Sequence, residues 1–107
     1  MRSVRGDIHV LRAPRSPLGH EQAGSRFAVV LQSEDLVLST VLVAPTSSSA
    51  VPRIFRPTIS IGGVSTQVLV EQSAAVALER LGSLVGHVSR RELDEINEAL
   101  RLVLELD

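Results

Sequence analysis

Arg26, Thr46 and Ser47 are the residues whose types and spacing best suit chemistry on a phosphate. Arg26 directly precedes the apolar run 27–31, and Thr46 and Ser47 follow the apolar run 41–44. Continuous apolar runs rich in β-branched residues indicate buried strands. A planar guanidinium binds two phosphate oxygens at once, and a nearby hydroxyl can bind another. The pattern therefore predicts two strands that deliver a cation and hydroxyls to one anion-binding site.

The charge of the chain is unevenly distributed, although its formal net charge is only −1. Residues 1–66 hold seven arginines and four acids, whereas residues 67–107 hold four arginines and eight acids. The basic half contains the suspected site, and a basic surface attracts anionic ligands. Ordinary surface charge is the alternative interpretation.

Several classes of site are disfavoured by composition. The chain has no cysteine, which removes thiolate metal sites, catalytic cysteines and disulfides. Its histidines, His9, His20 and His87, lack the spacing of a metal site. No apolar segment is long enough to cross a membrane, so a soluble cytoplasmic protein is expected. Only Phe27 and Phe55 are aromatic, so the chain lacks the aromatic platform of many single-strand binders, and arginine planes would have to do any stacking on bases.

The hydrophobic pattern predicts one domain over 1–107, mainly β with a C-terminal helix. Strands are expected at 5–11, 27–31, 36–44, 54–61, 66–70 and 84–88, and one or two helical turns at 74–81. Gly62-Gly63 is a hairpin-turn signal. Ser89-Arg90-Arg91-Glu92 is a capping box, and apolar residues at helical spacing continue the helix to about Leu106. These elements suit a small β-barrel or a curled antiparallel sheet with a packed helix.

Motifs along nearly the whole chain resemble those of the MazF/PemK family of toxin endoribonucleases. In order, they are Arg5-Gly6-Asp7-Ile8, Gly19-His20-Glu21-Gln22-Ala23-Gly24-Ser25-Arg26, the segment 41–48, Val68-Leu69-Val70-Glu71-Gln72, and Arg80-Leu81-Gly82 with Val85-Gly86-His87-Val88-Ser89. The pattern of the final helix is also similar. Two positions depart from the family. Phe27 stands where a proline is usual, and Ser47 stands where a threonine is usual if the segments are aligned on Pro45, whereas a shift of one residue would place Thr46 there.

The resemblance implies a fold, an activity and partners. The fold would be the SH3-like small barrel of MazF, CcdB and Kid. The activity would be sequence-specific cleavage of single-stranded mRNA through attack of the 2′-OH, without metal or cofactor. The partners would be a second copy of the chain and a cognate antitoxin whose acidic tail covers the RNA site.

Candidate roles follow for the residues of the motifs. Arg26 would stabilise the charge that builds on the phosphate, although a structural arginine bound to loop carbonyls is the alternative. Either Ser47 or Thr46 would hydrogen-bond the scissile phosphate, unless the serine-rich loop uses these hydroxyls for its own turns. Glu21 is a candidate general base or a residue that orients Arg26. The remaining candidates for RNA binding are His20, which titrates near neutrality, and Gln22, Arg53 and Arg56.

A second function from a different class stays open. The same fold could serve a non-catalytic protein that binds gyrase, or a module that binds only an antitoxin. Such a protein would not need Arg26 or the hydroxyl of Ser47, so these two residues discriminate between the hypotheses.

Overall fold

The computed structural model describes residues 3–13 and 26–107. It is mainly β with one C-terminal helix, as the sequence predicts. The strands are β1 (Asp7–Leu11), β2 (Arg26–Val30), β3 (Thr40–Ser47), β4 (Thr58–Ile61), β5 (Val64–Val68), β6 (Ala74–Ala77) and β7 (Leu81–His87). Two 3₁₀ turns, η1 (Val70–Gln72) and η2 (Leu78–Arg80), flank β6, and helix α1 spans Arg90–Leu104. Within the described ranges, no helix is long and apolar enough to cross a membrane.

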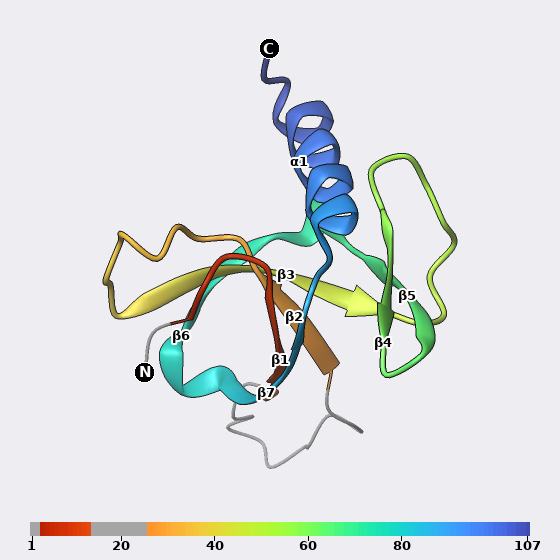
Figure 1. The fold of residues 1–107 in the computed structure, drawn as a ribbon. Coiled ribbons are helices and arrows are strands. Elements are labelled where there is room, and N and C mark those ends of the chain that lie inside the picture. Colours follow the sequence, from red (N-terminus) through yellow and green to blue (C-terminus); the bar gives the residue numbers. More distant parts are fainter. Residues whose placement is uncertain (1–2, 14–25) are drawn as a thin grey trace, which may run out of the picture.

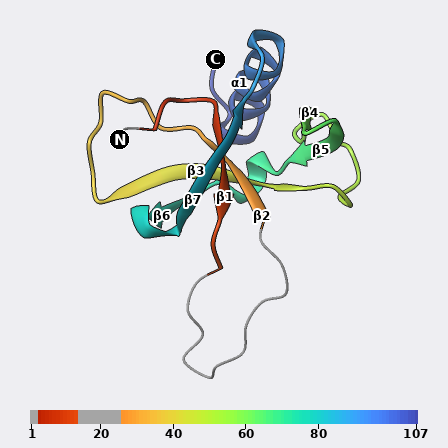
Figure 2. The ribbon, with the colours of Figure 1, turned by 60° about the horizontal axis from the view of Figure 1, so that its bottom comes forward.

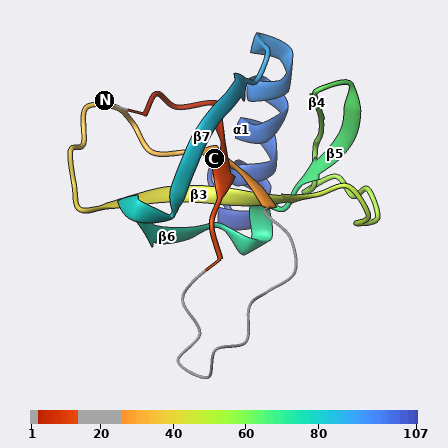
Figure 3. The same ribbon diagram turned by 90° about the horizontal axis from the view of Figure 1, so that it is seen from below.

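Strand β3 organises a curled antiparallel sheet (Figure 1). The strand order is β4-β5-β3-β2-β1-β7, and β6 also pairs with β3. The first half of β3 pairs with β6, from Thr40 opposite Ala77 to Val43 opposite Ala74, and its last two residues pair with β5. Figure 3 shows this division, with β6 beside one end of the long β3 and the β4–β5 hairpin at the other. In Figure 2, β7, β1 and β2 run side by side across β3.

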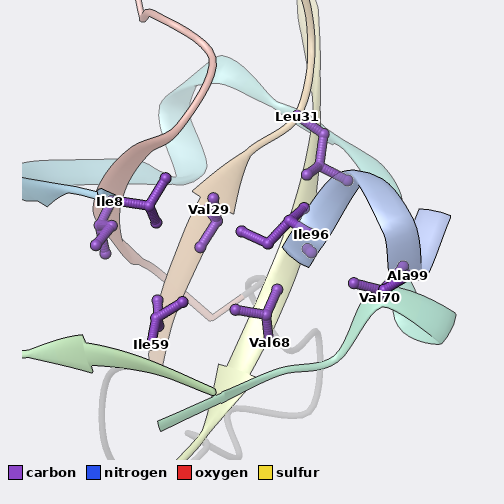
Figure 4. Close-up of a cluster of buried hydrophobic side chains, with 10 residues drawn as sticks. Ile8, Val29, Leu31, Ile59, Val68, Val70, Ile96 and Ala99 are labelled. Atoms are coloured by element: carbon purple, nitrogen blue, oxygen red, sulfur yellow. The ribbon is translucent and has the colours of Figure 1, made fainter. Parts of the chain in front are cut away.

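The helix closes the main core over the concave sheet. Ile96 is fully buried and lies between side chains of β2 and β5, among them Val29 and Val68 (Figure 4). Ile8 of β1, Ile59 of β4 and further Val, Leu and Ala residues complete this cluster. Because aliphatic residues fill it, the core depends on close packing of Val, Leu, Ile and Ala. A second cluster on the other face of the strands joins Leu11, Ala28, Val30, Val41, Val43 and Val76.

The predicted capping box is confirmed and also ties α1 to the sheet. Ser89 Oγ accepts a hydrogen bond from the Glu92 N–H at 3.1 Å, and the Ser89 N–H donates to Glu92 Oε1 at 2.7 Å. The other carboxylate oxygen of Glu92 accepts from the Ser60 N–H of β4 at 2.9 Å. One side chain therefore satisfies donors on both the helix and the edge strand. The last apolar residues of the helix do not contribute to the core, however, because Val103 and Leu104 are exposed.

Several predicted elements are corrected by the structure. The helical turns predicted at 74–81 are largely absent. Residues 74–77 form strand β6, and the 3₁₀ turn η2 follows it. Pairing with β3 outweighs the helical preference of alanine, because tertiary context overrides propensity. β3 starts at Thr40 and continues through Pro45 to Ser47, where β5 pairs with it. β4 begins only at Thr58, after Pro57.

The Gly62-Gly63 turn is confirmed. Both glycines have positive φ angles, 56° and 82°, and they join Ile61 directly to its partner Val64. Two consecutive positive φ angles are what a tight two-residue hairpin requires.

Candidate anion-binding groove

Antiparallel pairing of β2 and β3 brings Arg26 and Ser47 together. The paired residues run from Val30 opposite Val43 to Ala28 opposite Pro45. Two residues further along each strand lie Arg26, the first residue of β2, and Ser47, the last residue of β3. Both residues line one groove at this end of the two strands.

The groove has two chemically different sides. It has a volume of about 580 Å³, within the range of about 300–1,000 Å³ for small-molecule sites. Its polar lining residues are the exposed Arg26 and the hydroxyl residues Thr46, Ser47, Ser48, Ser49 and Thr66. Its apolar lining consists of Phe27, Ile61, Val64 and Val85, beside Gly62 of the hairpin turn. Among the lining residues that the structure describes there is no carboxylate, so this surface attracts anions.

The two adjacent hydroxyls differ in how they are used. Thr46 is buried, with 3% of its surface exposed, and its Oγ1 donates to the Phe27 carbonyl oxygen at 3.1 Å. Ser47 is half-buried, and its Oγ accepts from the Ala50 N–H at 3.1 Å and more weakly from the Ser49 N–H at 3.3 Å. A hydroxyl has one donor and two acceptor lone pairs. The Thr46 proton is therefore engaged within the fold, whereas the Ser47 oxygen is fixed by its turn and its O–H can reach Ser49 Oγ, at 3.3 Å, or a ligand.

Arg53 and Arg56 lie outside this groove. Both line a separate hollow between residues 52–58 and the outer face of α1, where Asp94, Glu95 and Glu98 also lie. The guanidinium of Arg56 donates to Glu71 Oε2 through Nε at 2.7 Å and through Nη2 at 2.6 Å. It also lies over the Phe55 ring, 5.5 Å from the ring centre. Arg56 thus fastens the 51–56 loop to η1.

The ion pair between Arg56 and Glu71 also affects the pKa of Glu71. Partial burial of the carboxyl raises its pKa, but this effect is outweighed by the hydrogen bond from Arg56, by one from the Glu71 backbone and by the positive charge of Arg56. The net result is a pKa below the ordinary value of 4.5. Glu71 is therefore ionised at neutral pH.

Three predicted site residues, His20, Glu21 and Gln22, lie outside the described residues. Conversely, sequence reasoning did not assign Phe27, Ile61, Val64 or Val85 to the site. Phe27 carried a signal, since it directly follows Arg26 where the family usually has proline. The others come from β4, β5 and β7, and only their long-range pairing brings them to the groove.

Solved structures with this architecture define its class. A MazE–MazF complex from Deinococcus radiodurans has a TM-score of 0.84 at 24% identity, over 100% of this chain and 99% of the other. An endoribonuclease in complex with its cognate antitoxin, from a mycobacterial species, has a TM-score of 0.79 at 14% identity, over 98% and 97% of the two chains. The curled antiparallel sheet with its C-terminal helix is therefore the fold of MazF toxins.

Sequence comparison establishes the family itself. The model of the PemK-like, MazF-like toxins of type II toxin–antitoxin systems matches residues 4–104. A Mycobacterium tuberculosis protein provisionally named as a toxin, Rv3098A, is 33% identical over 104 residues, which cover 96% of this chain and 98% of that protein. The chain belongs to the PemK-like, MazF-like toxin family, as its motifs predict.

Proposed function

We propose that this toxin is an endoribonuclease that cleaves single-stranded mRNA by attack of a ribose 2′-OH on the adjacent phosphate. The observation that carries the proposal is the groove that Arg26 and Ser47 both line, with no carboxylate among its described lining residues. A guanidinium and a hydroxyl donor in one groove suit the charge that develops on the non-bridging oxygens. Cleavage is expected at specific short sequences, without metal or cofactor.

The reaction assigns one task to each group. The 2′-oxygen forms a bond to phosphorus while the bond to the 5′-oxygen of the next nucleotide breaks. Arg26 neutralises the non-bridging oxygens through two parallel hydrogen bonds, and Ser47 donates its O–H to one of them. A base must accept the 2′-OH proton and an acid must protonate the leaving 5′-oxygen, which yields a 2′,3′-cyclic phosphate and a 5′-hydroxyl. Glu21 remains the predicted base, and His20 and Gln22 remain predicted contacts to RNA.

Ser47 is the better candidate for the phosphate hydroxyl than Thr46. The Thr46 hydroxyl donates to the Phe27 carbonyl in a buried position, so it could donate to RNA only by giving up that hydrogen bond. The Ser47 oxygen is held by two backbone N–H groups that occupy its lone pairs. Its O–H can therefore turn to a phosphate without loss of those bonds.

The proposed partners are a second copy of the chain and an antitoxin with an acidic tail, in the cytoplasm. Exposed Leu36, Val37, Leu38 and Leu42 support self-association, because large apolar patches are costly in water. The two solved relatives described with an antitoxin support the second partner. An acidic tail would compete with RNA for Arg26 through the same charge complementarity.

The test is incubation of the purified protein with a long RNA in excess EDTA, with analysis of product ends. We expect cuts that leave a 2′,3′-cyclic phosphate and a 5′-hydroxyl, lost in Arg26→Ala and kept in Arg90→Ala. Arg90 is a matched control because its side chain is 89% exposed on α1 and does not line the groove. A folded wild-type protein that makes no cuts at stoichiometric amounts would refute the proposal and favour a non-catalytic, gyrase- or antitoxin-binding function.

A further inference from the structure

The apolar side of the Arg26 groove is unexplained by phosphate binding alone. Val64 and Val85 are 55% and 43% exposed there, and Phe27 and Ile61 reach the groove from the edge of the main core. A phosphate gains nothing from these side chains, since they offer neither charge nor donors. A ligand that matches the whole groove must therefore combine an anion with an apolar flat group.

We infer that this apolar side binds the nucleobase next to the cleaved phosphate, with Phe27 as its aromatic contact. This inference rests on the proposed ribonuclease function and names how the same groove selects its substrate. Phe27 lines this groove together with Arg26, the residue before it in β2. A nucleotide carries its phosphate and its base on one ribose, which matches a groove with one polar and one apolar side. Bases stack on aromatic side chains whatever their sequence, because every base has a flat π-face.

The chemistry of this side also predicts how the base is recognised. The apolar lining side chains have no polar atoms, and the hydroxyl of nearby Thr66 already donates to the Val64 carbonyl at 3.1 Å. The apolar side chains of the groove would therefore hold a base by contact area and stacking, rather than by hydrogen bonds to the edges of the base. We expect cleavage to depend on the presence of a base at this position more than on its identity.

The chain offers a matched pair of variants for the test. Phe27 and Phe55 are its only two aromatic residues. Phe55 lies under Arg56 and does not line the groove, so Phe55→Leu is the control for Phe27→Leu. Val64→Ser is a second variant at an exposed position, which remains informative if Phe27→Leu lowers the stability of the core.

The experiment measures the affinity of each variant for a short single-stranded RNA that contains one site mapped from wild-type cleavage. A 2′-deoxy ribose at the cleaved position prevents the reaction, and further RNAs lack the base at one or the other flanking nucleotide. We expect Phe27→Leu to weaken binding about tenfold, Val64→Ser to weaken it less, and Phe55→Leu to leave it unchanged. Removal of the contacted base should weaken wild-type binding and abolish the difference between wild type and Phe27→Leu.

The outcomes separate this inference from the proposed function. If wild type cleaves RNA but folded Phe27→Leu and Val64→Ser bind the intact RNA normally, the base contact is refuted and the ribonuclease remains. Equal weakening of the abasic and intact RNAs by Phe27→Leu would also refute it, because the ring would then act on something other than the base. If wild type neither cleaves nor binds RNA, the ribonuclease function itself fails.

Discussion

Substitution of the two adjacent hydroxyl residues at the end of β3 separates a structural role from a catalytic one. Thr46→Val keeps the shape of a buried side chain but removes its hydroxyl, so the Phe27 carbonyl loses the donor now 3.1 Å away. Water cannot replace this donor easily, because Thr46 is only 3% exposed. A net hydrogen bond contributes about 1 kcal/mol, which in a domain of this size lowers Tm by about 4–8 °C.

Ser47→Ala should have the opposite profile. Its turn hydrogen bonds are near the surface, so their loss should cost less than about 1 kcal/mol. Loss of a donor to the developing negative charge should instead lower the single-turnover cleavage rate by about 10²-fold. Thermal unfolding and cleavage of one short RNA, measured on both variants, provide the two readouts.

The combination of results decides the assignment. We expect Thr46→Val to be less stable but close to wild type in rate, and Ser47→Ala to be stable but slow. A slow, fully stable Thr46→Val beside an active Ser47→Ala would refute the reasoning, since the hydroxyl that contacts phosphate would then be that of Thr46.

Four further predictions concern the fold and its association. Ser89→Ala removes the cap of α1 and should cost about 1 kcal/mol in chemical unfolding, with intrinsic cleavage unchanged. Glu71→Gln should destabilise the protein at neutral pH. Because the pKa of Glu71 is lowered in the folded state, the extra stability of wild type over Glu71→Gln should be complete above pH 4.5 and should disappear as the pH falls through the folded-state pKa. Thermal unfolding of both proteins across this pH range measures the difference. Gly6→Ala places a side chain at φ 96°, 2.9 Å from the His87 ring, and should cost about 1–3 kcal/mol; an unchanged Tm would argue against this strain. Val37→Asp puts a charge in an exposed apolar loop and should shift the protein towards monomer in light scattering, whereas an unchanged mass would exclude this loop from the contact.

Structural features that depend on residues close together in the sequence were predicted correctly. The capping box of Ser89 and Glu92 lies within four residues, and the structure forms both of its hydrogen bonds. The Gly62-Gly63 turn is similarly local. That Arg26 and Ser47 line one groove was also foreseeable, because Arg26 precedes one strand-like run and Ser47 follows the next.

Long-range pairing produced what the sequence alone did not reveal. The local sequence predicts helical turns at 74–81, yet 74–77 form β6, whose partner β3 lies more than thirty residues earlier in the chain. The apolar side of the groove joins β2 to the β4–β5 hairpin and β7, a combination set only by the strand order. Likewise, Arg56 fits an RNA contact by type and position, and only the fold shows that it pairs with Glu71.

The most direct measurement is the single-turnover cleavage rate of one short RNA, in EDTA, by wild type, Arg26→Ala, Arg26→Lys and Arg90→Ala. If the guanidinium stabilises the pentavalent phosphorus, Arg26→Ala should lose at least about 10²-fold in rate. Arg26→Lys should recover only part of this loss, because an ammonium lacks the planar fork. Arg90→Ala should cleave at the wild-type rate. An Arg26→Ala protein that is folded and cleaves as fast as Arg90→Ala would contradict the central role given to this groove.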